Sequence, residues 1–183
     1  MSHFTFTPFI EGKSIYLREV RETDVNERYY GWMNDQDITQ YLETRFYPNS
    51  LAKISEFVKS KDGDPNNIFL AIVDKAKDHH IGNIKLGPIN WIHRTAEIGI
   101  LLGEKNEWGK GIASETLNLI SAYAFKKLNL RKLTAGCYGN NKASEKAFIK
   151  AGFTIEGIRK SHFFYDGNYV DYVLLGLLTD QKV

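Results

Sequence analysis

The chain has 183 residues, of which 43% are hydrophobic and 25% are charged, the balance of an ordinary globular protein with one hydrophobic core. Its net charge of +2 and scattered basic residues give no support for a nucleic-acid partner, and no apolar run approaches the roughly 20 residues that a membrane helix needs. The N-terminal segment lacks the pattern of a signal peptide and Cys137 is the single cysteine, so we expect a cytoplasmic protein. The length of the chain fits one compact domain, so we expect residues 1–183 to form a single domain.

The first third of the chain carries one strand signal and two helix signals. Alternating hydrophobicity predicts a strand over Ser14–Val20, and Thr23 is a candidate N-cap for a helix that runs to about Asn34. Ser50 is a candidate cap for a second helix, which ends before the dense turn signal of Asp62–Asn67.

The rest of the chain predicts most of a sheet. Three strands form a meander at Ile68–Val73, His80–Ile89 and Thr95–Leu102. The remaining predicted elements are a helix from Gly111 to about Leu128, a strand at Lys132–Tyr138, a helix at Lys142–Ala151 closed by Gly152, and a hairpin of Phe153–Phe164 with Tyr169–Leu178. This order predicts an α/β fold with a mixed, mostly antiparallel sheet of about seven strands and about four helices.

The most informative stretch is Ala96–Ala113 (AEIGILLGEKNEWGKGIA), which is typical of a strand, a polar loop, a Gly-rich turn and a helix start. Helix N-termini bind phosphate because their first amides are unpaired and the macrodipole is positive there. Gly109 and Gly111 leave the backbone bare where a phosphate would approach, and Lys110 adds a cation. The turn is neither a Walker A motif nor a GxGxxG fingerprint. It predicts a diphosphate site, with a tight turn that binds no ligand as the alternative.

Glu97 is a carboxylate within this otherwise apolar strand. Alternation places it on one face with Gly99 and Leu101. Two interpretations stay open: a solvent-facing carboxylate on a half-exposed sheet, or a general base in a cleft with its pKa raised by partial burial. Gly99 would leave room for a ligand beside the base.

A third motif lies at residues 141–153 (NKASEKAFIKAGF). Asn141 can cap the predicted helix, and Ser144 lies one turn further on. A capped amphipathic helix that packs Phe148 into the core explains most of this segment. Such a helix does not require this spacing of the polar residues after a strand.

Together these motifs resemble the GNAT superfamily of acyl-CoA-dependent N-acyltransferases, over almost the whole chain. The family's Arg/Gln-x-x-Gly-x-Gly/Ala signature falls on residues 108–113, and Trp at its first position is similar to the branch of Rim-type ribosomal-protein N-terminal acetyltransferases. The family's second pattern, Asn-x-x-Ser/Ala followed by Lys-x-Gly-Phe, falls on Asn141, Ser144, Lys150, Gly152 and Phe153. The resemblance implies the GNAT fold, acetyl-CoA as co-substrate and no metal.

The resemblance also implies which residues form the site. Acetyl-CoA would lie in a V-shaped opening between the strands at Thr95–Leu102 and Lys132–Tyr138. The residues implied to contact it are Ile100, Leu101 and Leu102 at the pantetheine arm, Trp108, Gly109, Lys110, Gly111, Ile112, Ala113 and Ser114 around the pyrophosphate, Asn141 at the pantetheine or the thioester, and Phe148. Glu97 matches the base that deprotonates the amine before direct attack. Many relatives carry a Tyr at the place of Phe148 to protonate the leaving thiolate, so Ser144 is the nearest replacement acid.

The acceptor is expected to bind near residues 29–47 and the final hairpin. The Trp-x-Asn-Asp segment and residues 81–91 (IGNIKLGPINW) resemble acetyltransferases of amino-sugar biosynthesis, which implies Trp32, Asn34 and Arg45 as substrate-binding residues. Arg45 could bind a sugar-nucleotide phosphate, or form an ion pair with Glu43 or Asp35. The preferred acceptor is a nucleotide-linked amino sugar. The alternatives are a ribosomal-type peptide N-terminus, a polyamine, an aminoglycoside, or a CoA-binding sensor without turnover, and the chain is expected to be a monomer or homodimer.

Three other groups of residues receive structural interpretations. His79, His80 and His93 are expected in solvated loops because metal-ligand spacing is absent. Cys137 is expected as a buried small residue rather than a nucleophile. The aromatic residues of the closing hairpin are expected in the core or a cleft wall rather than as a base-stacking surface; these are Phe163, Phe164, Tyr165, Tyr169 and Tyr172.

Overall fold

The computed structural model describes residues 7–179, and one eight-stranded sheet runs through them in the order β1-β2-β3-β4-β5-β6-β8-β7. The strands are β1 (Ile10–Glu11), β2 (Ile15–Glu19), β3 (Ile68–Asp74), β4 (His79–Asn90), β5 (Thr95–Leu102), β6 (Lys132–Tyr138), β7 (Thr154–Tyr165) and β8 (Asn168–Leu178). Every neighbouring pair is antiparallel except β5 and β6, which are parallel. The predicted mixed sheet is therefore confirmed, and the additional strand is β1, which is too short to show a periodic pattern.

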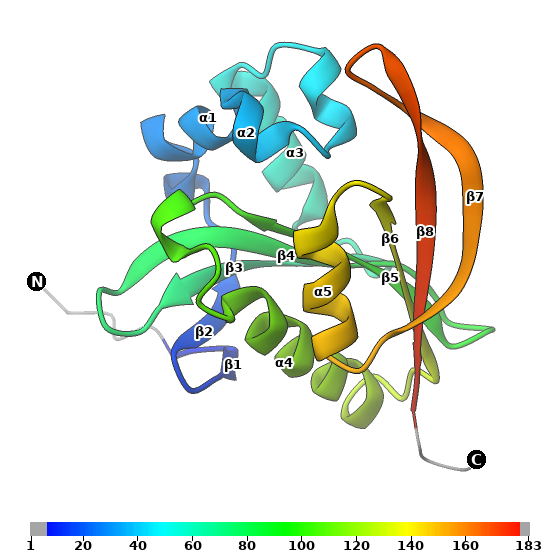
Figure 1. Ribbon diagram of the computed structural model, residues 1–183. Helices are drawn as coiled ribbons and strands as arrows, with labels where there is room; N and C mark the ends of the chain where they lie inside the picture. The colour runs from blue at the N-terminus through cyan, green and yellow to red at the C-terminus, as the bar shows by residue number, and fades with distance from the viewer. Residues whose placement is uncertain (1–6, 180–183) are drawn as a thin grey trace, which may run out of the picture.

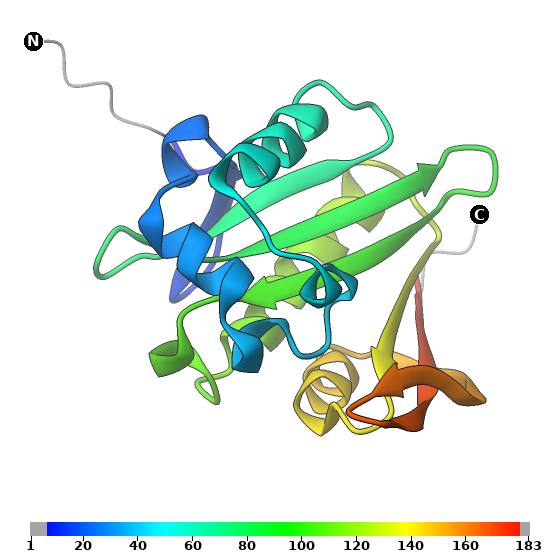
Figure 2. The same ribbon diagram turned by 90° about the horizontal axis from the view of Figure 1, so that it is seen from above.

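Helices cover both faces of the sheet (Figures 1 and 2). One face carries α1 (Glu27–Asn34), α2 (Gln36–Thr39) and α3 (Leu51–Lys61), and the other carries α4 (Ile112–Lys126) and α5 (Lys142–Lys150). The larger core lies between the sheet and the α4–α5 pair, and a smaller cluster of Tyr29, Trp32, Ile54 and Val58 lies under α1 and α3. Residues 7–179 also contain three short 3-10 turns: η1 (Glu22–Asp24), η2 (Glu43–Phe46) and η3 (Lys105–Glu107).

The helix ends follow local side-chain chemistry, with one correction. Ser50 caps α3 as predicted, since its side chain accepts a hydrogen bond from the amide of Lys53. The prediction that Thr23 caps α1 is wrong: the side chain of Asn26 accepts from the first amides of that helix. Asp24 is buried against Arg18, with oxygen–nitrogen distances of 2.7 and 2.8 Å, which holds residues 22–24 in the separate turn η1.

Gly152 closes α5 in the way that the sequence predicts. Its φ is +92°, its amide donates to the carbonyl of Ile149, and the amide of Phe153 donates to the carbonyl of Phe148. This pair of bonds is the Schellman pattern, which satisfies the last carbonyls of a helix. The turn directs the chain into β7.

His80 is buried, which corrects the expectation of a solvated loop histidine. The turn before β4 is shorter than predicted, so His79 and His80 belong to the strand, and His80 is only 3% exposed. Its Nε2 atom lies 2.9 Å from both the carbonyl oxygen of Gly82 and Oδ1 of Asn83. Its Nδ1 atom lies 3.8 Å from the carboxylate of Asp24.

The environment of His80 predicts a pH-dependent stability. Burial lowers the pKa of His80, although the nearby Asp24 carboxylate acts in the opposite direction. A histidine with a depressed folded-state pKa contributes stability above its unfolded pKa of about 6.5, and this contribution is lost as the pH falls below that value. We expect the free energy of unfolding in urea to decrease between about pH 7 and pH 5, and to decrease less in His80→Gln. An equal decrease in both proteins would assign the effect to other groups.

Candidate functional site

Strands β5 and β6 lie side by side only over their first three residues. The last pair joins Glu97 to Thr134, and the strands then diverge (Figure 2). The other edge of β5 stays paired with β4 as far as Leu102. The edge of β5 from Ile98 to Leu102 that faces β6 therefore has no strand partner among the described residues. Such an edge can receive an extended ligand as an added strand. We call this opening the β5–β6 fork.

Glu97 stands where the fork begins. Its neighbours Ala96 and Ile98 are buried on the opposite face of the sheet, whereas Glu97 itself is exposed. The expected partial burial of the carboxylate is therefore not found. Gly99 lies on the same face, and no atom lies within 4 Å of where its Cβ would be. The carboxylate thus has open space along the strand beside it.

The Gly-rich turn leads from β5 into α4. Gly109 and Gly111 adopt positive φ angles of +77° and +85°, a conformation that favours glycine. No side chain caps the helix at Gly111, and its first regular bond runs from the amide of Glu115 to the carbonyl of Gly111. The amides of residues 112–114 precede that bond, at the positive end of the helix dipole. Around Gly109 the space for a Cβ is empty.

Charged side chains around the turn fall into two groups. Lys110 and Lys77 each lie 3.0 Å from the carboxylate of Glu107, which is almost fully buried and anchors the loop. Lys150 comes from the end of α5, and its Nζ atom lies 4.0 Å from where a Cβ of Gly111 would be. Nothing in the sequence shows this approach, because it depends on how α5 packs along α4.

Trp108 and Ser114 have structural contacts at the same turn. The indole nitrogen of Trp108 donates to the carbonyl of Leu102 at 3.0 Å, which fastens the turn to the end of β5. The hydroxyl of Ser114 lies 3.3 Å from the carbonyl oxygen of Ala147 and links α4 to α5. The strand edge, the turn and the helix start are therefore brought together as the sequence predicts.

The third motif forms the start and the buried side of α5. The side chain of Asn141 accepts a hydrogen bond from the amide of Ser144 at 3.1 Å, so it caps the helix. Ser144 is half-buried on the first turn. Phe148 is 2% exposed, and its ring packs edge-on against Phe153 with centroids 5.1 Å apart. No hydroxyl is available at that position.

Tyr138 and Tyr165, with Arg45 against both rings, form an aromatic wall at the β6 side of the fork. Tyr138 at the end of β6 donates to Glu43 at 2.6 Å and accepts from Arg45 at 2.9 Å. Arg45 also donates to the carbonyl of Phe164 at 2.9 Å, so it links η2 to the β7–β8 hairpin. Arg45 and Glu43 share the Tyr138 hydroxyl. Asp35, the other anticipated ion-pair partner, pairs with Lys105 at 2.8 Å instead.

Trp32 and Asn34, which lie in α1, make contacts that hold neighbouring segments of the fold together. Trp32 is 4% exposed, and its ring packs so closely on Gly103 that a Cβ there would lie 2.0 Å from a ring atom. Asn34 donates to the carbonyl of Asn49 at 2.8 Å and accepts from its amide at 3.2 Å. Trp32 is therefore not part of an open surface. Neither set of contacts brings these two residues to Glu97.

A hollow of about 670 Å³ lies between the α1–α2 region, η2 and the tip of the β7–β8 hairpin. We call it the acceptor-side pocket. Its lining combines amides, aromatic rings, one guanidinium and two carboxylates; the residues are Met33, Asn34, Gln36, Asp37, Thr39, Gln40, Arg45, Phe46, Tyr47, Pro48, Tyr165 and Asp166. Arg45 and Tyr165 belong to both this pocket and the aromatic wall, so the two are continuous.

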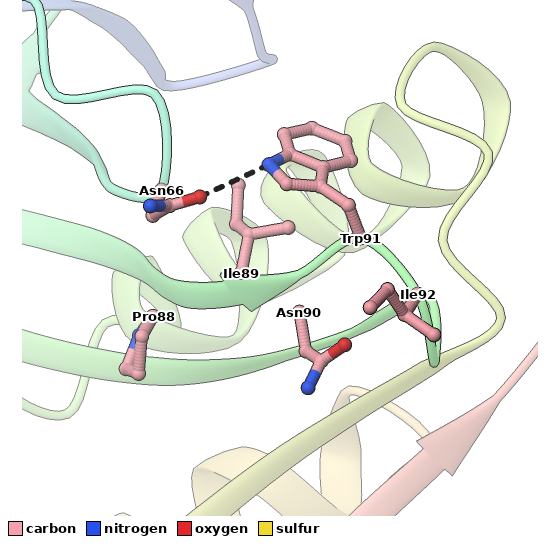
Figure 3. A pocket seen from close by; sticks show the side chains of 6 residues that line it. All are labelled: Asn66, Pro88, Ile89, Asn90, Trp91 and Ile92. Atoms are coloured by element: carbon pink, nitrogen blue, oxygen red, sulfur yellow. Dashed lines mark hydrogen bonds between the residues drawn. The ribbon is translucent and has the colours of Figure 1, made fainter.

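A second hollow of about 440 Å³ lies at the opposite end of β5, at the β4–β5 turn (Figure 3). It is lined by Asn66, Pro88, Ile89, Asn90, Trp91 and Ile92, and the indole nitrogen of Trp91 donates to Asn66 at 3.1 Å. None of these side chains is titratable. We therefore assign no chemistry to this hollow.

Metal and thiol chemistry have little support at the site. Within residues 7–179, no group of three or more His, Cys, Asp or Glu side chains could hold a metal ion. Cys137 is buried as predicted, and burial raises the pKa of its thiol to about 11, so the reactive thiolate is scarce at neutral pH. None of the helices in this part of the chain is long and apolar enough to cross a membrane.

Comparisons with known proteins agree with this geometry. The family model of the acetyltransferase (GNAT) domain matches residues 14–154. A probable N-acetyltransferase of Bacillus subtilis, YjcK, is 31% identical over 177 residues, covering 93% of this chain and 97% of that protein. The structure of spermidine N-acetyltransferase from Vibrio cholerae, in complex with CoA and spermine, has a TM-score of 0.81 at 27% identity and covers 90% and 95% of the two chains. RimL, a ribosomal L7/L12 alpha-N-protein acetyltransferase solved with CoA, shares the fold with a TM-score of 0.81 at 21% identity, over 91% and 95% of the two chains.

Proposed function

The chain belongs to the GNAT family of N-acetyltransferases, and from this premise we propose that it moves the acetyl group of acetyl-CoA to a primary amine by direct attack. The observation that carries the proposal is the β5–β6 fork, with Glu97 at its apex and the Gly-rich turn at the end of the same strand. One strand thus links a base to an anion site. We further propose that the described residues act as one catalytic domain, because a single sheet runs through them.

The donor would lie along the open edge of β5. Backbone groups of residues 98–102 would pair with the amides of the pantetheine arm, as an added strand does. The amides from Gly109 to Ser114 would hold the pyrophosphate at the start of α4, and the space beside Gly109 and Gly111 is free of side chains other than Lys150. These features fit an extended ligand that carries a diphosphate.

The reaction needs a base because a primary amine is protonated at neutral pH. Glu97 would accept that proton directly or through a water molecule. The amine nitrogen then bonds to the acetyl carbon and loses its second proton, and the carbon–sulfur bond breaks, which gives an amide and a thiolate. No covalent enzyme intermediate is required, and the buried Cys137 is a poor candidate for one.

We propose a nucleotide-linked amino sugar as the acceptor. The acceptor-side pocket offers amide groups and aromatic faces, which suit a sugar and a base, and the Arg45 guanidinium, which suits a phosphate. One of its carboxylates, Asp37, lies 2.6 Å from the ammonium of Lys105, which partly offsets its charge. The pocket is therefore less acidic than a site for a polycation should be.

A polyamine is the second candidate acceptor, because a spermidine N-acetyltransferase is similar to this chain over most of its length. The two acceptors differ in charge, which makes them easy to separate. We expect kcat/KM to be higher for a nucleotide-linked amino sugar than for spermidine, a Ser-starting peptide or an aminoglycoside. A higher kcat/KM for spermidine would replace the first candidate by the second.

Lys150 supplies a prediction for the donor site. Charge reversal in Lys150→Glu places a carboxylate beside the proposed pyrophosphate, so the Kd for CoA should rise about twofold to fivefold, the upper range of an exposed ion pair. The difference should shrink at high salt. Titration calorimetry measures both effects. Lys126→Glu, at the far end of α4, is the matched control and should bind CoA like the wild type. Equal affinity in Lys150→Glu would place the phosphates elsewhere.

A further inference from the structure

Strand β8 brings a phenol to the β5–β6 fork. Tyr172 pairs with Tyr138 of β6, and its side chain leans along the sheet over Gly136. A Cβ on Gly136 would lie 2.0 Å from the Tyr172 hydroxyl oxygen, so any larger residue at position 136 would displace that hydroxyl. The hydroxyl therefore lies directly on β6, beyond the point where β5 and β6 separate.

The same hydroxyl faces the side of the sheet that carries Glu97. Thr134 is the parallel partner of Glu97, and Gly136 follows it by two residues, so all three lie on one face. The negative charge of Glu97 reaches Tyr172 and contributes to raising its pKa. A carboxylate from β5 and a phenol from β8 thus approach the fork from its two sides.

Helix α5 supplies no suitable donor for the proton that the departing sulfur needs. The departing thiolate must be protonated, but Phe148 is buried and has no acidic hydrogen. Ser144 has a hydroxyl, but an aliphatic hydroxyl is a far weaker acid than a phenol, and this side chain lies on α5 rather than over β6. Tyr172 places a phenol over β6 at the fork, whereas the hydroxyl of Tyr138 is already bonded to Glu43 and Arg45.

We propose that Tyr172 donates the proton to the departing sulfur, a role that rests on the proposed acetyl transfer. As the amine nitrogen bonds to the acetyl carbon, the carbon–sulfur bond breaks and its electron pair stays on sulfur. The proton of the Tyr172 hydroxyl moves to that sulfur and gives the free thiol of CoA. Glu97, which has released the ammonium proton to solvent, takes the second proton that the nitrogen loses as the amide forms. It passes this proton to the phenolate, which restores both side chains.

The groups around Tyr172 are compatible with a proton donor. Glu97 of β5 and Cys137 of β6 act on it electrostatically, the thiol from the opposite face of the sheet, while Arg159 and His162 lie against its ring from β7. Burial and the charge of Glu97 raise the pKa of Tyr172, Arg159 acts in the opposite direction, and the net direction is upward. The phenol therefore keeps its proton at neutral pH, as a donor must.

The experiment compares Tyr172→Phe with the wild type in acetyl transfer. The variant keeps the ring that packs against Phe163 and His162 and removes only the O–H group. We expect kcat to fall about 100-fold, the low end for a general acid because a thiolate is a fairly good leaving group. The Kd for CoA should stay unchanged, and the basic limb of the kcat–pH profile should disappear. Tyr169→Phe, exposed on the same strand, should match the wild type.

A second variant tests the position of the hydroxyl. Gly136→Ala should displace it and lower kcat to a similar extent, and the double variant should be no slower than the slower single variant. A wild-type kcat in Tyr172→Phe, or a lowered kcat that keeps its basic limb, would overturn the role of Tyr172 and leave the acetyl transfer standing. Failure of the wild type to acetylate any amine would overturn both.

Discussion

Replacing Glu97 by glutamine lowers kcat for acetyl transfer by about 10²–10⁴-fold, the range for loss of a positioned general base. The amide has nearly the same shape as the carboxylate but cannot accept the amine proton. Glu97 is exposed at the apex of the β5–β6 fork and its neighbours are buried on the other face, so the substitution should disturb neither the core nor the donor site. The Kd for CoA should therefore change little.

The measurement is the pH dependence of kcat, with Glu56→Gln as the matched control. Glu56 is exposed on α3, and this variant should retain the wild-type rate. In Glu97→Gln the rate should recover partly at high pH, where free amine is abundant without a base. An unchanged rate for Glu97→Gln at every pH would remove Glu97 from the mechanism.

Replacing Gly111 by valine should raise the Kd for CoA by about 10- to 100-fold, the loss expected when one hydrogen bond to a charged group is broken. Gly111 has a φ of +85°, which a β-branched residue resists, and the new side chain would enter the space between the turn and Lys150. Both effects misplace the first amides of α4.

The control separates backbone strain from ligand contact. Gly63 has a φ of +70° in the turn after α3, and no atom lies within 4 Å of where its Cβ would be, so Gly63→Val imposes a similar conformational cost far from α4. Calorimetric titration should show weak CoA binding in Gly111→Val and wild-type binding in Gly63→Val, at comparable melting temperatures. Wild-type affinity in Gly111→Val would mean that the pyrophosphate lies elsewhere.

Local patterns were sufficient for most of the fold. The bounds of β5 and β6 agree with the periodicity of the sequence, because each strand is short, apolar and bounded by polar turns. The hairpin turn at Asp166 and Gly167 also follows from local chemistry: both residues adopt positive φ, which the Asp-Gly pair tolerates. The Gly-rich turn is another case, since strand, glycines and helix are adjacent in the chain.

Features that depend on distant residues were not predictable in the same way. His80 looks like part of a charged turn, and its burial depends on how η1 and α1 pack over β4. The hydrogen bonds of Arg45 join segments that are 93 and 119 residues apart in the chain. In the sequence, Tyr172 stands out only as one of several aromatic residues in the closing hairpin. Its approach to the fork requires the register of β8 on β6 together with a glycine at position 136.

The measurement that tests the proposed acetyl transfer most directly uses acetyl-CoA labelled in its acetyl group. It is incubated with the protein and four amines together: a nucleotide-linked amino sugar, spermidine, a Ser-starting peptide and an aminoglycoside. Mass detection of the products and CoA binding are followed on the same sample. We expect that label appears in the amide of one amine, that CoA is released in equal amount, and that Glu97→Gln forms this product far more slowly. Tight binding of acetyl-CoA without labelled amide from any of the amines would contradict acetyl transfer and favour a CoA-binding sensor.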